Sequence, residues 1–403
     1  MKVLLLTPDI PFPSESGAAI RNWGIIGGLF DAGHQVTLLS FTERAIGAES
    51  KPLYERCHAV HTAPLPRRSK SSRLIKLATS SSADMESRLA SKAYEAALRR
   101  LLRNNSFDIV QFSGLELGGY LDVIMQEKRG AKVVYDALNA EAELQRVIAE
   151  VDRRSLRRAP AQLYSKAQAR RLARFEQRVC RGVDAIVAVS EEDRNLLKPY
   201  TGAPITVMSN GIHVKDYRQP DESQRARGQL VFTGKMDYRP NVDAIEWFCA
   251  NILPPVRQQL PGIQLKVVGR NPHRRLGALA GKDGITLTGW VESALPYLHE
   301  ASLYVVPLRM GSGTRLKILQ AMAASCAVIS TSIGAAGLND EARSAIAIAD
   351  DAPAFAEAIV ALLGDDKRRE AMGELARRQV LAHYDWRALM PALLQVYARL
   401  ELG

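Results

Sequence analysis

Short apolar segments alternate with helix-like segments along almost the whole chain, and the alternation runs twice. In the first half, we predict helices over 18–32 and 90–103 and a mostly helical segment over 140–181 that is interrupted near Pro160. The strands predicted between them are Val3–Leu6, Gln35–Ser40, Asp108–Phe112, Lys132–Tyr135 and Ala185–Val189. Apolar strands separated by helices are typical of a parallel sheet with crossover helices.

The same pattern restarts after the charged segment 216–228, which contains glycine and proline and lacks apolar periodicity. Further helices are predicted over 242–251, 317–323, 354–363 and 386–400. The predicted strands are Leu230–Thr233, Gln264–Val268, Ile285–Thr288, Leu303–Val306, Val328–Ser330 and Ala345–Ile348. We therefore predict an α/β fold with two doubly wound, Rossmann-like domains over 1–215 and 229–384. Ligands of such sheets bind at the carboxyl ends of the strands, so the expected site is a central cleft that the two domains face.

The composition agrees with a globular protein of two domains. The chain has 403 residues, of which 47 % are hydrophobic and 24 % are charged. No segment reaches the roughly 18 apolar residues that a membrane-spanning helix needs, and the run Val3–Leu6 is too short for the core of a signal peptide. The four cysteines have neither metal-type nor redox spacing. We expect a cytoplasmic protein.

The net charge of +11 is concentrated in two segments. The first contains Arg67, Arg68, Lys70, Arg73 and Lys76, and the second contains Arg153, Arg154, Arg157, Arg158, Lys166, Arg170, Arg171, Arg174, Arg178 and Arg181. Three interpretations stay open: solvated helix faces, a surface that faces anionic lipid headgroups, or a nucleic-acid surface. No nucleic-acid-binding motif accompanies the charges, so nucleic acid is not expected as a partner.

The strongest local motif is Val305–Lys317, in which a buried strand leads into Pro307, a Gly-Ser-Gly loop and then a helix. Glycines let the backbone approach an anion, and the amides at a helix N-terminus attract phosphate. Arg315 and Lys317 add positive charge beside that helix start. The motif predicts a diphosphate site rather than a plain glycine turn.

Two weaker glycine elements have the same order of strand, loop and helix. Gly17 follows the first strand and opens a helix that carries Arg21, and Gly234 with Lys235 follows the first strand of the second half. Neither element forms a G-x-G-x-x-G motif, and no Walker loop occurs, which disfavours dinucleotide and ATP-type chemistry. No Asp-x-Asp motif or histidine cluster indicates a metal.

Taken together, these elements resemble glycosyltransferase family 4, with two Rossmann-like domains in the GT-B fold, and especially its bacterial exopolysaccharide and cell-envelope branch. The resemblance covers nearly the whole chain. It rests on PFPSESGAAIRNW (11–23), AGHQVTLLSF (32–41), VAVSEEDRN (187–195), SNGIHVKDY (209–217), FTGKMDYRPNVDAIEWF (232–248), VVGRNP (267–272), TGWVE (288–292) and PLRMGSGTRLKILQAMA (307–323).

The resemblance implies a retaining glycosyltransferase of the hexosyltransferase type that needs no cofactor or metal. The C-terminal domain would bind a nucleotide-sugar, with UDP- or GDP-sugars expected. The N-terminal domain would bind a glycan or lipid-linked acceptor, at the inner face of the cytoplasmic membrane if the basic surface binds lipid. The final segment 385–403 would pack back on the N-terminal domain. The implied catalytic residues are Asp136, Asn139, Arg315 and Lys317, and the implied donor-binding residues are Gly17, Arg21, Gly234, Lys235, Arg270, Trp290, Val291, Gly311, Ser312, Gly313, Thr314, Arg315, Leu316, Lys317 and Gln320.

Three positions depart from the family pattern. The two glutamates of the Glu-x7-Glu motif correspond to Ser312 and Gln320, and the second glutamate of the family grips the ribose hydroxyls. Gln320 can still donate and accept there, without the strength of a charge-assisted bond. The usual cleft histidine corresponds to Leu138, and the aspartate after Asn-Gly corresponds to His213.

Two other functions stay open. One is a sugar-nucleotide epimerase or hydrolase of the same fold, which would consume donor without an acceptor. The other, suggested by Leu138 and Gln320, is a nucleotide-sugar-binding protein with reduced or lost catalysis.

Overall fold

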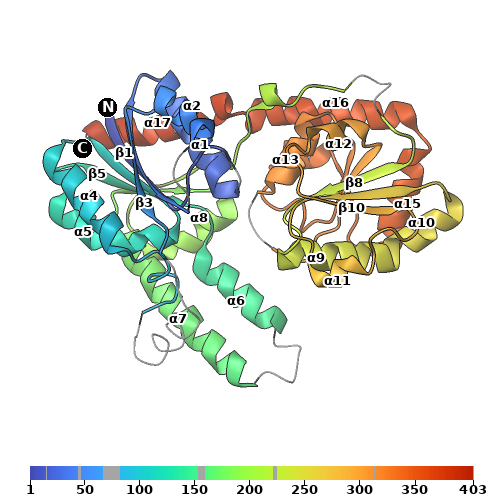
Figure 1. The fold of residues 1–403 in the computed structure, drawn as a ribbon, viewed down its shortest axis with the longest axis horizontal. Helices are drawn as coiled ribbons and strands as arrows, with labels where there is room; N and C mark the ends of the chain where they lie inside the picture. Colours follow the sequence, from blue (N-terminus) through green and yellow to red (C-terminus); the bar gives the residue numbers. More distant parts are fainter. Residues whose placement is uncertain are drawn as a thin grey trace. The chain divides into compact units, whose positions relative to one another are not determined.

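Two α/β units, each built on its own parallel sheet, make up the computed structural model of the chain (Figure 1). The structure describes residues 1–14, 16–43, 47–66, 82–152, 159–220, 225–311 and 314–402. Unit 1 comprises Met1–Ser209 and Leu389–Gly403, and unit 2 comprises Asn210–Ala388. The basic segment that contains Arg67, Arg68, Lys70, Arg73 and Lys76 lies outside the described residues, as do Arg153, Arg154, Arg157 and Arg158.

The sheet of unit 1 has seven described strands in the order β3-β2-β1-β4-β5-β6-β7, and all their pairings are parallel. The strands are β1 (Lys2–Thr7), β2 (Gln35–Thr42), β3 (Ala59–Pro64), β4 (Ile109–Ser113), β5 (Lys132–Ala137), β6 (Ala185–Ala188) and β7 (Ile205–Val207). The central strand β4 is buried at every residue. Strands covered on both faces read as continuous apolar runs, so β1, β2, β4, β5 and β6 were predictable.

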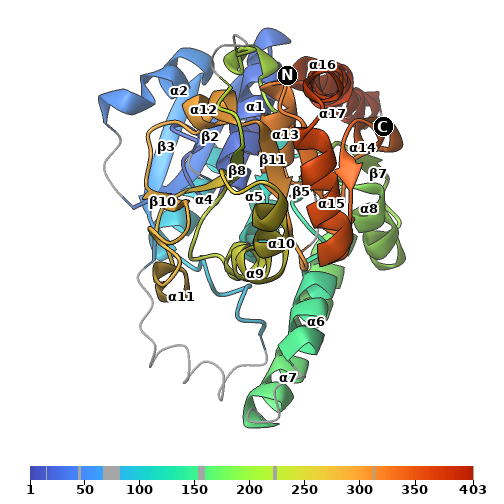
Figure 2. The same ribbon diagram turned by 90° about the vertical axis from the view of Figure 1, so that its right-hand side faces the viewer.

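Helices cover both faces of this sheet (Figures 1 and 2). They are α1 (Gly17–Asp31), α2 (Lys51–Arg56), α4 (Lys92–Asn104), α5 (Leu121–Glu127), α6 (Glu141–Asp152), α7 (Ala159–Arg181) and α8 (Glu191–Leu197). The core between the sheet and α4, α5 and α7 includes Tyr94, Leu98, Ile124, Phe175 and Val179. Helix α1 begins at the cap Ser16, whose side chain accepts from the amide of Ala19 at 3.0 Å.

The last helix, α17 (Trp386–Leu402), returns to unit 1. Met390 packs so closely against Gly28 of α1 that a Cβ there would lie 2.2 Å from its side chain. The buried hydroxyl of Tyr397 donates to Gln111 on β4 at 2.6 Å. The apolar face of this helix therefore completes the α1 side of the sheet.

The sheet of unit 2 has six described strands in the order β10-β9-β8-β11-β12-β13, again all parallel. The strands are β8 (Gln229–Thr233), β9 (Gln264–Val268), β10 (Ile285–Gly289), β11 (Leu303–Val306), β12 (Val328–Ser330) and β13 (Ala347–Ile348). The helices are α9 (Arg239–Trp247), which continues through a π-helical turn at Phe248–Ile252, then α10 (Leu253–Gln259), α11 (Arg274–Gly277), α12 (Leu295–Glu300), α13 (Leu316–Ala323), α14 (Asp340–Ser344), α15 (Ala352–Leu363) and α16 (Asp366–His383).

Two apolar cores flank this second sheet. Helices α12, α13, α14 and α16 cover one face through a core that includes Tyr304, Ile318 and Val380. Helices α9, α10 and α15 cover the other face through a core that includes Phe232, Phe248 and Phe355. The start of α13 at Leu316 is therefore held near the carboxyl end of β11 by packing against the first of these cores.

Two strands were missed by the sequence interpretation. β3 lies at one edge of the unit 1 sheet and carries His61 and Thr62, so its alternation is weak. β7 lies at the other edge and has three half-buried residues. Edge strands are covered less completely than central ones, so their sequences lack the apolar run that reveals a buried strand. Pro160 lies in the first turn of α7, where its missing amide costs little.

The buried carboxylate of Glu176 and the half-buried carboxylate of Glu141 join α6 to α7. Glu176 on α7 accepts from the amides of Glu141 and Ala142 at 2.7 and 3.3 Å and so caps the start of α6. Glu141 accepts from Asn139 at 3.0 Å. Burial is the largest cause that raises the pKa of both Glu141 and Glu176 to about 7, and their mutual repulsion adds to the rise for Glu176.

These pKa values predict that stability falls as the pH rises. Between the unfolded value near 4.5 and about 7, the folded chain binds more protons than the unfolded chain, so the free energy of unfolding decreases through this window. Glu141→Gln keeps an acceptor for Asn139 but removes the charge. We expect its loss of stability between pH 5.5 and pH 8 to be about 1–3 kcal/mol smaller than that of the native chain, as measured by denaturant unfolding.

The matched control is Glu55→Gln, which changes an exposed carboxylate of unit 1. It should leave the pH dependence as it is in the native chain. Equal slopes for the native chain and Glu141→Gln would mean that Glu141 is ionised in the folded state throughout this range.

Candidate functional site at the strand ends

Glycines at the ends of two neighbouring strands shape the carboxyl edge of the unit 2 sheet. Gly234 follows β8 and Gly269 follows β9, and both have φ near +153°. A Cβ on Gly269 would lie 1.7 Å from the carbonyl oxygen of Gly234, so only glycine fits there. The side chain of Lys317, at the start of α13, lies against this close approach of the two strand ends.

Lys317, in the first turn of α13, reaches across to the loop after β8. Its ammonium lies 2.8 Å from Asn241 Oδ1 and 4.0 Å from the centre of the Phe232 ring. A Cβ on Gly234 would lie 2.7 Å from the same nitrogen. Among the described residues, no carboxylate lies within ion-pair distance of Lys317. Its positive charge is therefore held by neutral groups only.

Arg315, the N-cap of α13, brings a second cation to the same edge. A Cβ on Gly311 (φ +123°) would lie 2.3 Å from the Arg315 guanidinium, so the glycine is what lets this side chain fold over the loop. Burial lowers the pKa of Arg315. Burial, and then repulsion from Arg315, hold the pKa of Lys317 well below its usual range. These two half-buried cations lie side by side, and Lys317 has no carboxylate partner among the described residues, so an anion would stabilise the site.

Of the remaining residues of the Gly-Ser-Gly motif, some lie outside the described residues and others anchor the loop. Ser312 and Gly313 lie outside the described residues. Thr314 is buried and donates to the carbonyl of Gly337 at 3.1 Å, while a Cβ on Gly337 would lie 2.6 Å from the Thr314 amide nitrogen. The half-buried Leu316 packs against the core beside α13. Thr314 and Leu316 thus anchor the loop and the helix start.

Other predicted donor-binding residues lie along the same edge of the sheet. Lys235 is exposed, with its ammonium 3.9 Å from Asp237, and the carbonyl of Arg270 accepts from the amide of Met236 at 3.0 Å. Trp290 and Val291 follow β10. The Trp290 side chain is 71 % exposed, whereas Val291 packs on the core. Gln320 lies one turn after Lys317 and donates to the hydroxyl of Tyr217 at 2.8 Å.

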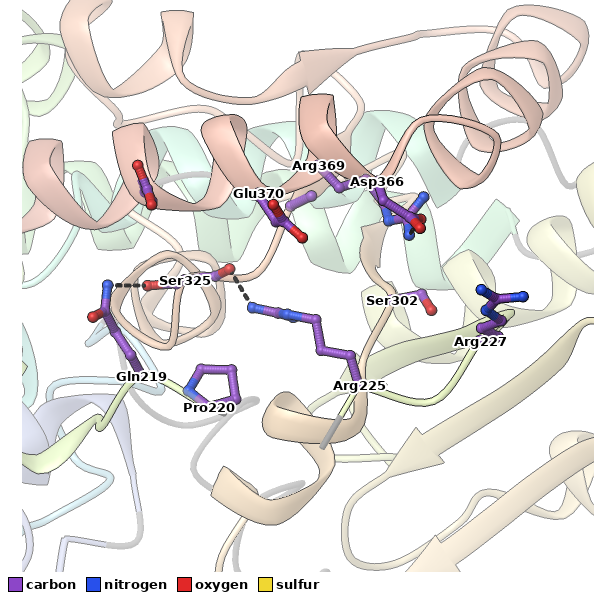
Figure 3. Close-up of a pocket in the computed structure, with 11 residues that line it drawn as sticks. Gln219, Pro220, Arg225, Arg227, Ser302, Ser325, Asp366, Arg369 and Glu370 are labelled. Carbon is purple, nitrogen blue, oxygen red and sulfur yellow. Dashed lines mark hydrogen bonds and ion pairs between the residues drawn. The ribbon is translucent and has the colours of Figure 1, made fainter. Parts of the chain in front are cut away.

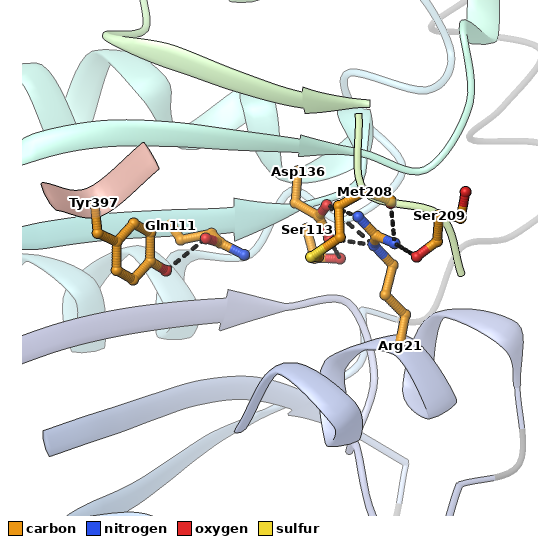
Figure 4. Close-up of polar contacts among 7 residues, drawn as sticks. All are labelled: Arg21, Gln111, Ser113, Asp136, Met208, Ser209 and Tyr397. Carbon is orange, nitrogen blue, oxygen red and sulfur yellow. Dashed lines mark hydrogen bonds and ion pairs between the residues drawn. The ribbon is translucent and has the colours of Figure 1, made fainter. Parts of the chain in front are cut away.

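In unit 1, Arg21 and Asp136 form a fully buried ion pair (Figure 4). The Arg21 guanidinium donates to both carboxylate oxygens of Asp136 at 2.6–3.0 Å, and to the carbonyls of Met208 and Ser209 at 2.9 and 3.1 Å. Ser113 also donates to Asp136 at 3.3 Å. Neither charged side chain has exposed surface to offer a ligand in this arrangement. The pair instead fixes α1 and the segment after β7 to the end of β5.

The remaining unit 1 positions surround this ion pair at the strand ends. Gly17 is exposed and opens α1. Asn139 is half-buried and donates to Glu141. Leu138 stands where the family has histidine, and a Cβ on Gly114 would lie 3.5 Å from its side chain.

Sequence reasoning did not single out two important residues of the unit 2 edge. Asn241 bridges Lys317 and the carbonyl of Lys235, to which its amide donates at 2.9 Å. Phe232 offers the face of its ring to the Lys317 ammonium. Both lie within the stretch 232–248 that carries the family resemblance. However, their roles depend on contacts with α13, about 80 residues later in the chain, which no local pattern reveals.

A cavity of about 380 Å³ lies at the opposite end of the same sheet (Figure 3). Its lining residues include Arg227, Ser302 and Ala327, which lie within two residues of the starts of β8, β11 and β12. Asp366 and Glu370 of α16 also line it. Arg225 extends into it and donates to the carbonyl of Ser325 at 2.6 Å. This cavity is therefore separate from the cations at the carboxyl edge.

Two further properties concern the described residues alone. No helix among them is long and apolar enough to cross a membrane. No three of their histidine, cysteine, aspartate or glutamate side chains are grouped so as to hold a metal ion.

Comparisons with known proteins agree with this arrangement. The family model for the glycosyl transferase 4-like domain matches residues 16–211, and the model for glycosyl transferases group 1 matches residues 227–365. The Anabaena protein HepE, solved in complex with UDP and glucose, superimposes with a TM-score of 0.64 at 12 % identity, covering 99 % of this chain and 100 % of that one.

Curated relatives match over a shorter length. The phosphatidyl-myo-inositol mannosyltransferase of Mycolicibacterium smegmatis is 27 % identical over 52 % of this chain and 56 % of its own length. The glycogen synthase of Mycobacterium tuberculosis is 26 % identical over 59 % of this chain and 60 % of its own length. The chain thus matches little more than half the length of these relatives.

The two family models cover one Rossmann-like unit each, and the two parallel sheets have the architecture of the structural neighbours. The chain therefore belongs to glycosyltransferase family 4 and has the GT-B fold.

Proposed function

We propose that this protein is a retaining, metal-independent glycosyltransferase that moves a sugar from a nucleotide-sugar to a hydroxyl group of a glycan or glycolipid. The observation that carries the proposal is the pair of half-buried cations, Arg315 and Lys317, at the start of α13. A nucleoside diphosphate is the leaving group of such a reaction, and its charge grows as the glycosidic bond breaks. Cations already in place stabilise that charge without reorganisation.

The ligands and names of similar proteins support the donor class. HepE was crystallised with UDP and glucose, and the curated relatives are a mannosyltransferase and a glycogen synthase. We infer a UDP- or GDP-sugar as the donor. The first relative is named for a phosphatidylinositol acceptor, which supports a lipid-linked acceptor as one candidate.

Metal independence is proposed because protein cations can take the part that a divalent ion has in other transferases, namely neutralising the diphosphate. Lys317 and Arg315 are the residues in that position, and Asn241 orients the ammonium of Lys317. Retention of configuration is proposed because the chain belongs to this family. The leaving phosphate would then help to deprotonate the acceptor on the same face of the sugar.

Leu138 gives a specific reason to keep a second candidate, a nucleotide-sugar-binding protein with reduced catalysis. A leucine cannot hydrogen-bond to a sugar hydroxyl, and here it lies next to Gly114 at the strand ends of unit 1. Such a protein would bind nucleotide but transfer nothing. An epimerase or hydrolase would differ again, because it would consume the donor in the absence of any acceptor.

The first test is binding of nucleoside diphosphates. A thermal-shift series with UDP, GDP, ADP, CMP and dTDP should show a rise in melting temperature with one base. With that nucleotide, Lys317→Met should weaken binding by about ten- to a hundredfold, because a charge-assisted bond to phosphate is lost. The unliganded variant should unfold at the same temperature as the native protein or higher, since a buried charge is removed.

The matched control is Lys282→Met, an exposed lysine of unit 2. It should leave the affinity unchanged. If Lys317→Met bound the nucleotide as tightly as the native protein, the diphosphate site would have to lie elsewhere.

Binding should also take up protons. In the free protein the pKa of Lys317 is well below its usual range because of burial and Arg315. A bound diphosphate favours the charged amine and raises that pKa, so affinity should fall as the pH rises between the pKa values of the free and bound protein. Calorimetry in buffers of different ionisation heats would measure the uptake, which Lys317→Met should abolish. Unchanged proton uptake in that variant would assign it to another group.

We further propose that unit 1 binds an anionic membrane surface through an arginine stripe on α7. The stripe consists of Arg170, Arg174, Arg178 and Arg181, all exposed and spaced so that they share one side of the helix. Arg178 pairs with Glu86, whereas Arg170 and Arg174 have no ion pair among the described residues. Figures 1 and 2 show α6 and α7 side by side, extending away from the unit 1 sheet.

Replacing Arg170 and Arg174 by glutamine should weaken binding to phosphatidylglycerol vesicles by roughly 30-fold, since each near-surface cation contributes on the order of 1 kcal/mol. High salt should weaken the native protein in the same way. Co-sedimentation with vesicles measures both effects. The matched control replaces Arg368 and Arg378, which are exposed on α16. Equal losses in both double variants, or binding of the native protein to neutral vesicles, would contradict a site on α7.

A further inference from the structure

Gln320 on α13 and Tyr217 in the segment before β8 form a side-chain pair. The Gln320 amide nitrogen donates to the Tyr217 hydroxyl at 2.8 Å. No described residue donates to the carbonyl oxygen of the same amide. The pair therefore holds the amide so that its acceptor end is left for a ligand.

Tyr217 is itself anchored at its backbone. Arg377 on α16 donates to the carbonyl of Tyr217 at 2.6 Å, and the same nitrogen contacts the carbonyl of Ala323 at the end of α13. The Tyr217 ring packs against the core on the α13 side of the sheet. Burial is the largest cause that raises the pKa of Tyr217 to about 12, so the hydroxyl stays protonated at physiological pH. Tyr217 is thus a neutral side chain that is held in one position beside α13.

The position of Gln320 relative to Lys317 indicates which part of a bound nucleotide the carbonyl oxygen of the Gln320 side chain would contact. The two residues are three positions apart on one helix, about 5 Å along its axis. In a nucleoside diphosphate, the ribose follows the phosphates at a comparable separation. With a phosphate at Lys317, the ribose hydroxyls come within reach of the residue one turn further along α13.

We propose that Tyr217 is a positioning residue for donor binding: it turns the Gln320 amide so that the carbonyl oxygen accepts from a ribose hydroxyl. This inference rests on the donor site of the proposed function. A glutamate at position 320 would need no positioning residue, because both of its carboxylate oxygens can accept a hydrogen bond. A glutamine has one acceptor and one donor end, so a group that binds the donor end decides which one faces the ribose.

The test measures ribose recognition rather than affinity alone. The nucleoside diphosphate found by thermal shift is compared with its 2′-deoxy and 3′-deoxy analogues by calorimetry. In the native protein, at least one analogue should bind about 3- to 10-fold more weakly, as expected for one lost hydrogen bond. Gln320→Ala should bind all three equally. Tyr217→Phe should lose most of the discrimination while binding the deoxy analogues as the native protein does.

Three further variants separate positioning from general damage. Tyr384→Phe removes another hydroxyl of unit 2, which accepts from the amide of Asn339 at 2.7 Å, and should keep the discrimination. Gln320→Glu should keep it too, even when combined with Tyr217→Phe. The double variant Tyr217→Phe with Gln320→Ala should be no worse than Gln320→Ala alone, because the two residues act through one contact.

Full discrimination in Tyr217→Phe would overturn the inference and leave the proposed function intact. So would a loss in Tyr217→Phe that is equal for the parent nucleotide and its analogues, since it would reflect a structural effect. If the native protein bound no nucleoside diphosphate, the proposed donor site would be contradicted. This outcome is seen in the thermal-shift series, before any analogue is compared.

Discussion

The half-buried ammonium group of Lys317, which has no carboxylate partner in the described part of the chain, is the constraint around which the carboxyl edge of unit 2 is arranged. Among the described residues, Lys317 contacts an amide oxygen and an aromatic face, and Arg315 is close enough to depress its pKa further. Taking such a charge out of water is costly unless an opposite charge arrives. The packing of α13 against one core of unit 2, through Ile318, Leu319 and Met322, offsets this cost in the free protein. An anion that binds beside Lys317 would stabilise the charge further.

The glycines at this edge of the sheet provide the room that the two cations need. At Gly234, a Cβ would crowd the Lys317 nitrogen, and the φ of +153° disfavours any residue with a side chain. At Gly269, a Cβ would overlap the carbonyl oxygen of Gly234. Gly311 has the same relation to Arg315. Each glycine thus removes volume where a cation must come close to the backbone. The two cations and the glycines that let them approach the backbone together form one site that suits a charged ligand.

Much of the fold and part of this edge could be predicted from the sequence. Buried central strands appear as apolar runs, and a strand, a glycine loop and a helix start with cations appear in order over 305–317. Contacts between distant segments could not be predicted, because no local pattern encodes them. Asn241 binds Lys317 from 76 positions away, and Tyr217 binds Gln320 from 103 positions away. The predicted clefts and roles that involve both units stay predictions.

Arg21 and Asp136 were singled out as site residues by their match to family stretches, but in the structure they pair with each other. The family stretches identify both positions, yet the structure pairs them in a fully buried ion pair that also binds the carbonyls of Met208 and Ser209. Removing either partner would leave an unpaired buried charge, the most costly kind of change in a core. Ser209 is also the last residue of unit 1 before the chain enters unit 2. A demand for charge pairing at this point ties the start of α1, the end of β5 and the exit of the chain together. Such a requirement is enough to keep these residues in place whether or not either one touches a substrate.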